Sequence, residues 1–234
     1  MAKAIGYGCS LKLEWLNKAM ELFSSDTEEI QFKELLNEYL SLYINNATRL
    51  RKTRQILMHI WHYDKPGMRE LRQEALCLIQ NKAEYAPAIH LCLLYVVYPV
   101  FADICRYTGK LLQFQDEITT PMLRQKLFEE WGERGALESI SRRVTLTLKE
   151  LGFLSSVKRT RYRVNQIVVD DPKLVNFLIY VALKSERVEY LPISELEHLS
   201  IMFPFIFHIS NEQFIGDNRF LLNTFNSDLT IFAR

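Results

Sequence analysis

The chain has few cysteines, and their spacing excludes the usual cysteine-based scaffolds. The four are Cys9, Cys77, Cys92 and Cys105. A disulfide framework or a structural zinc site needs closely spaced cysteines or cysteine–histidine pairs, and none is present. His59 and His62 have helical i, i+3 spacing but no third ligand near them in the sequence. The pattern predicts reduced, mostly buried thiols in a cytoplasmic protein that holds no metal.

Catalytic motifs are missing as well. The sequence contains no phosphate-binding GxxxxGK[ST] loop, no GxGxxG dinucleotide fingerprint and no GxSxG nucleophile turn. Its histidines are scattered, and no acidic cluster lies on a glycine-framed loop. We therefore expect a protein that is not an enzyme and that uses no cofactor.

Long apolar runs are lacking too. The most apolar stretch, residues 88–104, is interrupted by His90 and Pro99, whereas a bilayer-spanning helix needs roughly 20 apolar residues. The stretch therefore predicts a core helix kinked near Pro99, with His90 buried. The first fifteen residues contain no apolar segment of the signal-peptide type. We expect no membrane partner.

Residues 119–164 carry the most specific structural pattern. Thr120-Pro121 favours a helix start, since a hydroxyl can cap the first turn and proline loses no hydrogen bond there. Apolar residues recur at helical spacing as far as Trp131. A glycine-containing connection, 132–138, then leads into a second helix, 139–151. Two short helices joined in this way predict a helix-turn-helix.

The second of these helices has two faces. At about 100° per residue, an apolar face that repeats at Ile140, Val144 and Leu148 predicts a core contact. The opposite face carries Arg142, Thr145 and Lys149, with Arg143 at its flank. We expect this second face to be exposed to solvent.

The pattern changes to short strands after Gly152. Residues 157–164 predict a strand or hairpin that carries Lys158, Arg159, Arg161 and Arg163. A helix-turn-helix followed by a hairpin is a winged helix. Its second helix can enter the major groove of DNA while the hairpin places Lys and Arg against phosphates.

The charge distribution points to the same partner. Residues 142–163 hold seven basic residues and one acid, Glu150, in a chain whose net charge is only +1. This local asymmetry predicts a surface for a polyanion, with double-stranded DNA as the expected partner. The alternative is a winged helix that binds protein, since surface Lys and Arg are common.

A second basic stretch lies in the helix predicted from residue 47 onward. It carries Arg49, Arg51, Lys52 and Arg54 within two turns of its start. Cations at a helix N-terminus oppose the helix dipole, so helix stability does not explain them. We expect these cations either to bind a polyanion or to pair with the acidic residues of the preceding helix. Those acids are Glu28, Glu29, Glu34 and Glu38.

The patterns together predict a mainly α protein in three parts. Residues 1–115 form a helical domain, and residues 116–168 form the winged helix-turn-helix. Residues 169–234 form a small α/β part of helices with a C-terminal β-hairpin, predicted from the runs 219–225 and 229–232. The order helix, helix, hairpin suggests a degenerate second winged helix there.

The chain resembles the small BrxA-type proteins of bacteriophage-exclusion (BREX) defence systems. The resemblance covers roughly residues 47–164: NATRLRKTRQILMHIW, then LCLLYVVYPVFADI, then FEEWGERGALESISRRVTLTLKELGFL with a basic wing. It implies a cytoplasmic, mostly helical bacterial protein with a winged helix and a likeness to the antitermination factor NusB. It also implies binding to double-stranded DNA and phage resistance beside methyltransferase and ATPase subunits, without catalytic residues. Residues 49–54 and the winged-helix positions would carry that role.

Two other functions fit the same residues. A winged-helix transcriptional regulator would usually bind a palindromic site as a symmetric dimer. A protein-binding adaptor of a larger complex would use the same module and the aromatic C-terminal part without binding DNA. The NusB likeness keeps RNA as an alternative ligand, recognised through shape and 2′-hydroxyl contacts.

Overall fold

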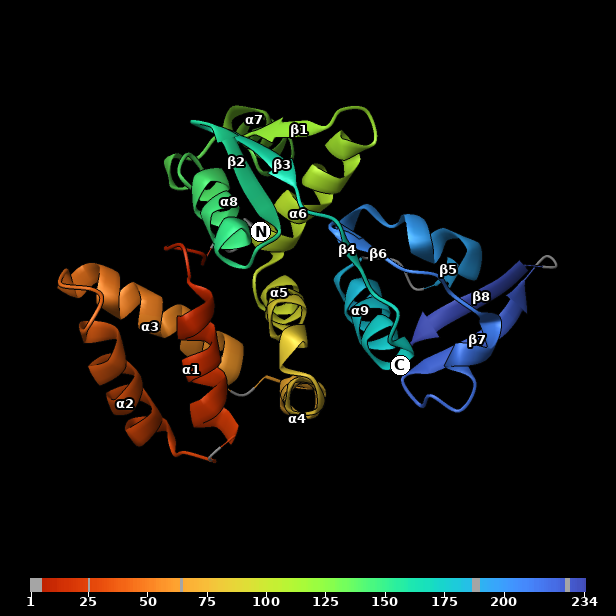
Figure 1. The fold of residues 1–234 in the computed structure, drawn as a ribbon, viewed down its shortest axis with the longest axis horizontal. Helices are drawn as coiled ribbons and strands as arrows, with labels where there is room; N and C mark the ends of the chain where they lie inside the picture. The colour runs from red at the N-terminus through yellow and green to blue at the C-terminus, as the bar shows by residue number, and fades with distance from the viewer. Residues whose placement is uncertain (1–5, 25, 64, 187–189, 226–227) are drawn as a thin grey trace.

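The chain folds as a mostly helical protein with a small, sheet-containing C-terminal part (Figure 1). The computed structural model describes residues 6–24, 26–63, 65–186, 190–225 and 228–234. The N-terminal helices are α1 (Leu13–Ser24), α2 (Glu29–Ser41), α3 (Ala47–Trp61) and α4 (Met68–Asn81). A 3-10 turn, η1 (Ala83–Tyr85), leads into α5 (Ala86–Val97) and α6 (Pro99–Leu112). The helices α1, α2 and α3 lie on one side of α5 and the C-terminal part lies on the other (Figure 1).

The expected kink near Pro99 is a full break between two helices. The segments 83–97 and 99–112 meet at 118°. Proline donates no backbone hydrogen bond, so Pro99 can start α6 but cannot continue α5. Among the described residues, no single helix is long and apolar enough to cross a bilayer, and these two segments meet that test only as a bent pair.

Two short helices, joined by a 3-10 turn, and a three-stranded sheet follow α6. They comprise β1 (Glu117–Thr119), α7 (Thr120–Trp131), η2 (Gly135–Leu137), α8 (Ile140–Glu150), β2 (Leu154–Lys158) and β3 (Arg161–Val164). The strands are antiparallel in the order β1-β3-β2. We call this the α7–β3 unit. Thr119, and not Thr120, caps α7, because its side chain accepts a hydrogen bond from the Met122 N–H.

The remaining chain repeats part of this topology. After β4 (Ile167–Val168) come α9 (Pro172–Ser185), β5 (Leu191–Pro192), η3 (Ile193–His198), η4 (Ser200–Met202), β6 (Phe205–Ile206), η5 (Asn211–Phe214), β7 (Phe220–Phe225) and β8 (Asp228–Ala233). The β7–β8 hairpin confirms the predicted C-terminal hairpin. The sheet order β5-β8-β7 matches β1-β3-β2, while β4 and β6 form a separate parallel pair. Between β5 and β7, however, the described residues form 3-10 turns instead of an α-helix.

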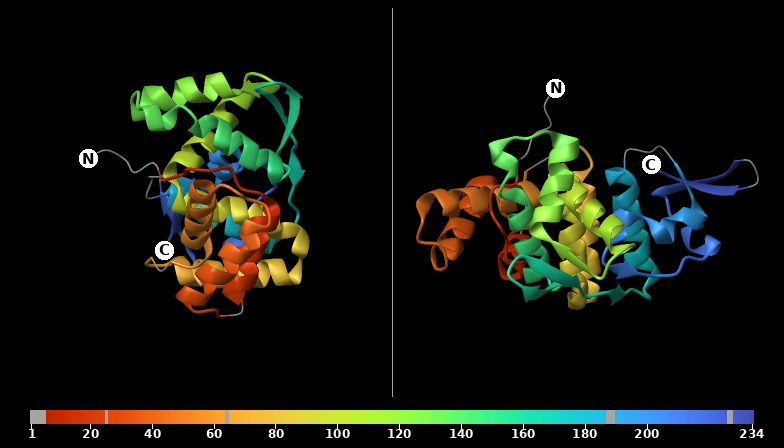
Figure 2. Two further views of the ribbon diagram at one scale, coloured as in Figure 1. Left: turned by 90° about the vertical axis from the view of Figure 1, so that its left-hand side faces the viewer. Right: turned by 90° about the horizontal axis from the view of Figure 1, so that it is seen from above.

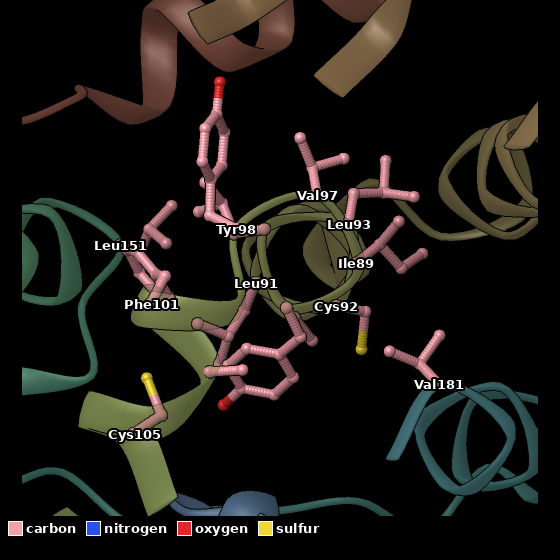
Figure 3. Packing of buried hydrophobic residues seen from close by; sticks show 14 of the residues in the cluster. Ile89, Leu91, Cys92, Leu93, Val97, Tyr98, Phe101, Cys105, Leu151 and Val181 are labelled. Atoms are coloured by element: carbon pink, nitrogen blue, oxygen red, sulfur yellow. The ribbon is translucent and has the colours of Figure 1, made fainter. Parts of the chain in front are cut away.

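The core is centred on α5. Ten of its twelve residues are buried, so it packs on all sides, as Figure 3 shows for Leu91, Cys92 and Leu93. Val181 of α9 faces it from one side, and Leu151, at the end of α8, lies near Phe101 of α6. Three of the four cysteines are buried and Cys77 is exposed, in agreement with the expectation of mostly buried thiols.

A buried arginine joins α4 to the end of α3. Arg72 is 1% exposed. Its guanidinium donates to the carbonyl oxygens of Ile60, His62, His59 and Tyr63 at 2.7–3.2 Å. These are carbonyls that the C-terminus of a helix leaves without intrahelical partners, and a cation there also favours the helix dipole.

Replacing Arg72 with Met is therefore expected to lower the free energy of unfolding by about 2–4 kcal/mol, because several buried carbonyls lose a charged donor. Urea unfolding followed by circular dichroism measures the change. Arg69→Met is the matched control on the same helix, since its side chain is 62% exposed, and it should shift stability by less than about 0.5 kcal/mol. Equal effects of the two substitutions would show that the hydrogen bonds from Arg72 to the α3 carbonyls add nothing to the free energy of unfolding.

His90 is buried, as the sequence predicts. Burial lowers its pKa to about 3, and the neutral ring donates through Nε2 to Asn17 Oδ1 at 2.9 Å. The unfolded chain binds a proton at this histidine below about pH 6.5, while the folded chain stays neutral. The unfolded state therefore binds more protons between pH 6.5 and 3, and stability falls as the pH is lowered through that window.

Below pH 6.5, His90 is expected to lower the free energy of unfolding by up to about 1.4 kcal/mol for each pH unit of acidification. Above pH 6.5 it contributes nothing to the pH dependence. His90→Gln should flatten the profile between pH 6.5 and 5, before most carboxylates titrate. His198→Gln, at an exposed site, should leave the profile unchanged. Chemical unfolding at a series of pH values makes the comparison, and an unaltered slope in His90→Gln would contradict the assignment.

Candidate nucleic-acid interface

The α7–β3 unit is attached to α6 by both apolar and polar contacts. Leu123 and Leu127 of α7 and Val144 and Leu148 of α8 are fully buried. Trp131, at the end of α7, donates its indole N–H to Asp103 of α6 at 2.9 Å. Gly132 then ends the helix with a φ of +74°, a conformation that costs other residues free energy. These contacts fix the direction of α8.

The solvent face of α8 is narrower than the sequence predicts. Arg142 and Lys149 are exposed as expected, and Arg143 is half-buried at the flank. Thr145, predicted on the same face, is 0% exposed, and its hydroxyl donates to the Arg142 carbonyl at 3.0 Å. That prediction is wrong, because the elements packed against α8 cover the flanks of its apolar face as well as the face itself. Arg142 and Lys149 remain as the exposed cations.

The β2–β3 hairpin ends in a cluster of positive charge. Lys158 lies directly opposite Arg161 in the strand register, and Arg159 and Thr160 form the tip, where Thr160 has a φ of +67°. Lys158, Arg159 and Arg161 are all exposed. Like charges directly opposite each other destabilise a strand pair, so folding alone does not favour this arrangement.

One carboxylate partly neutralises this hairpin. Glu117 of β1 forms ion pairs with Arg161 at 3.4 Å and with Arg163 at 3.1 Å. Its side chain is 24% exposed, whereas those of the two arginines are 52% and 63% exposed. Sequence analysis missed Glu117, because it lies 44 and 46 residues from its partners and only the pairing of β1 with β3 brings them together.

The basic residues of α3 do not share one face. Arg51 is exposed on the side of α3 away from its buried residues, Lys52 is exposed at the flank, and Arg49 is exposed at the helix end. Arg54 turns toward α2 and donates to Asn37 Oδ1 at 2.7 Å. Within the described ranges, no ion pair joins these four cations to the acidic residues of α2. The carboxylates of α2 therefore do not account for the cations of α3.

No metal centre is evident in the part of the chain that the structure describes, which contains no suitable group of three or more His, Cys, Asp or Glu side chains. His59 and His62 instead have aromatic neighbours. The ring of His62 lies 4.7 Å from that of Phe32, and His59 Nδ1 lies 3.3 Å from the Tyr98 hydroxyl. Burial, with Lys65 and Arg72 nearby, lowers the pKa of His59.

Comparison with known proteins assigns the chain to no family. No protein-family model, curated protein or solved structure matches the chain significantly.

The geometry of Glu117 predicts how the hairpin responds to a change of charge. Glu117→Gln keeps the shape of the side chain but removes the anion shared by Arg161 and Arg163. The variant should elute from heparin at a higher salt concentration than the wild type and bind a polyanion about 3–10-fold more tightly at low salt. Glu195→Gln, an exposed site on η3, makes the same change in net charge and should have a much smaller effect. Equal shifts in both variants would mean that only net charge matters.

Proposed function

We propose that the chain is a non-catalytic, double-stranded DNA-binding protein. The α7–β3 unit acts as a winged helix, in which α8 enters the major groove and the β2–β3 hairpin lies against phosphates. The basic start of α3 adds phosphate contacts. The resemblance described above then supports a role as the DNA-binding component of a bacterial BREX defence system, in the cytoplasm and beside other subunits of that system.

The observation that carries this proposal is the charge at the hairpin tip. Lys158 and Arg161 face each other across the strands, with Arg159 between them at the turn, and only Glu117 offsets Arg161 among the described carboxylates. A phosphate that docked at the tip would turn this repulsion into charge-assisted hydrogen bonds. Phosphate binding therefore gives a physical reason for an arrangement that folding does not favour.

The exposed face of α8 supports the proposed entry of this helix into the major groove. Arg142 and Lys149 are about 20° apart around the helix and two turns apart along it, by a rotation of about 100° per residue. Leu146 lies between them and is half-buried. Two cations flanking an apolar side chain can contact phosphates at the edges of a groove, while the apolar residue meets a base edge or a thymine methyl group.

A salt series with duplex DNA tests the proposal. Each phosphate neutralised by a cation adds about 0.9 to the slope of log affinity against log salt concentration. Arg142→Ala/Lys149→Ala should therefore lower the slope by up to about 1.8 and weaken binding about 10–100-fold at low salt. Gel-shift or anisotropy titrations supply both values. The control variant Lys173→Ala/Lys184→Ala removes two exposed cations from α9. It should change neither the salt slope nor the affinity at low salt.

The outcomes separate the proposal from its alternatives. No retardation of duplex DNA at low salt, with stable binding to a partner subunit, would favour the adaptor. Footprinting at one palindromic site would favour the transcriptional regulator, and preferential competition by duplex RNA would favour RNA. The defence role needs a further readout: in cells that carry the whole system, Arg142→Ala/Lys149→Ala should restore phage plating.

A further inference from the structure

Exposed apolar side chains gather around one groove between α6 and the C-terminal part. Phe114 is 88% exposed, the highest value among the large apolar side chains of the described residues, and Val168 and Ile206 are 66% and 40% exposed. Val168 lies opposite Ile206 in the β4–β6 register. Ile206 lines the groove, and so does Gln113, which directly precedes Phe114. We call this the α6–β6 groove. Exposed apolar residues that cluster in this way mark an interaction site, whereas scattered ones need no explanation.

The α6–β6 groove has room for an aromatic ring. Its volume is about 250 Å³, and a cavity of about 150 Å³ already holds benzene. Its apolar lining comes from the ends of α6 and β3 and from the segment that leads into β6: Leu112, Val164, Leu199, Met202, Phe203, Pro204, Phe205 and Ile206. In Figure 1 and in the right-hand view of Figure 2, α6 (yellow-green) lies between the β1-β3-β2 sheet and the C-terminal part (blue). The groove therefore lies at a junction between two parts of the fold.

Phe114 is held beside this groove without filling it. Its backbone N–H donates to the Leu111 carbonyl at 3.1 Å, in the turn that follows α6. Its ring stays in solvent, although the two residues before it, Leu112 and Gln113, line the groove. An apolar ring stabilises a protein only when it is removed from water. The position of Phe114 therefore brings the folded chain little stability, but a second molecule that covered the ring would gain binding free energy from it.

The charges around the groove fit a second copy of this chain better than a charged partner. Lys110 and Asp116, both exposed, flank Phe114 and have opposite charges. Glu197 is the one carboxylate among the described residues that line the groove, and its Oε1 already accepts the Ile209 N–H at 2.7 Å. A patch with little net charge meets an identical patch without repulsion, whereas it attracts neither an acidic nor a basic partner.

We propose that the chain forms a twofold-symmetric dimer in which Phe114 of each copy inserts into the α6–β6 groove of the other. Because Phe114 and the groove are neighbours on one chain, a twofold arrangement buries both of them twice in a single self-complementary contact. A different protein would have to supply both a ring and a groove of its own to cover the same surface. The inference goes beyond the proposed function and does not depend on DNA binding.

Sedimentation velocity at loading concentrations of about 1–300 μM tests the dimer. The wild type should move from the mass of one chain, 27.6 kDa, toward twice that mass, with a dissociation constant of about 1–50 μM. Phe114→Glu should weaken self-association at least about 100-fold, because a charge would enter each of the two apolar grooves. Leu42→Glu is the matched control, since it makes the same change at another exposed apolar site, the C-cap of α2, and should leave the dissociation constant unchanged.

A pair of complementary variants tests the contact itself. Ile206→Lys places a cation at the groove and should also prevent self-association on its own. An equal mixture of this variant with Phe114→Glu should restore a dimer to within about tenfold of the wild-type affinity. One of its two contacts then joins the introduced carboxylate to the introduced ammonium, while the other keeps both native residues. Circular dichroism checks that each variant folds, and Val168→Lys, at a more exposed site, takes the place of Ile206→Lys if that variant does not.

The results decide the inference independently of DNA binding. A wild type that stays monomeric at the highest concentration would overturn it. So would a Phe114→Glu variant that dimerises as the wild type does, since the interface would then lie elsewhere, or a mixture of the two complementary variants that stays monomeric. None of these experiments contains DNA, so the proposed function stands or falls on its own titrations.

Discussion

The packing around the α5–α6 bend determines where every other part of the molecule lies. The helix α5 is buried on all sides between the N-terminal helices and α9, and α6 leaves it at 118° to carry the α7–β3 unit. On α6, Gly109 allows a close approach, because a Cβ there would lie 2.0 Å from the Ser200 carbonyl oxygen of η4. One bent pair of helices therefore serves as the common core of all three regions.

This shared core explains how residues distant in sequence can act together. Tyr7 packs on Tyr98 and on Phe101, the residues on either side of the bend, at 5.3 Å from each ring. The N-terminal segment before α1 thus contacts α8 through Thr147, the α5–α6 bend through Tyr98 and α3 through Lys52. Buried aromatic contacts of this kind resist small displacements, because protein interiors are densely packed. The relative placement of α3 and α8 is accordingly a property of the core, and surface ion pairs are not needed to maintain it.

Sequence periodicity predicted the features that depend on local chemistry. The core face of α8, the buried His90 and a kink at Pro99, which the structure shows as a full break, all follow from spacing, burial preference or a missing N–H. The exposure of Thr145 was predicted wrongly, because helical periodicity gives the direction of a side chain but not the width of the surface that covers it. The order helix, helix, hairpin predicted for residues 169–234 is met only in part, because the segment after Pro192 forms 3-10 turns in place of a second helix.

Contacts between segments distant in the sequence could not be predicted from its periodicity. Glu117 meets Arg161 and Arg163 only because β1 pairs with β3, and nothing near it in the sequence indicates that pairing. The hydrogen bonds of Tyr7 and Leu11 to Thr147 span 140 and 136 positions. A single sequence shows which residues are basic, whereas the fold decides which carboxylate approaches them and which helix lies beside them.

The two units with matching strand order differ in the charge of their hairpins. In the second unit Arg219 lies just before β7, but its guanidinium is held by Asp217 and by Glu74 of α4. The exposed side chains of β7 that the structure describes are Leu221, Asn223 and Thr224, none of them basic. This strand offers little to a phosphate, because its described exposed side chains are uncharged and the adjoining Arg219 is paired, although Arg234 after β8 is exposed. The polyanion contacts proposed for the first hairpin therefore depend on Lys158 and Arg159, whose charges no described carboxylate offsets, and the shared strand order alone would predict nothing about binding.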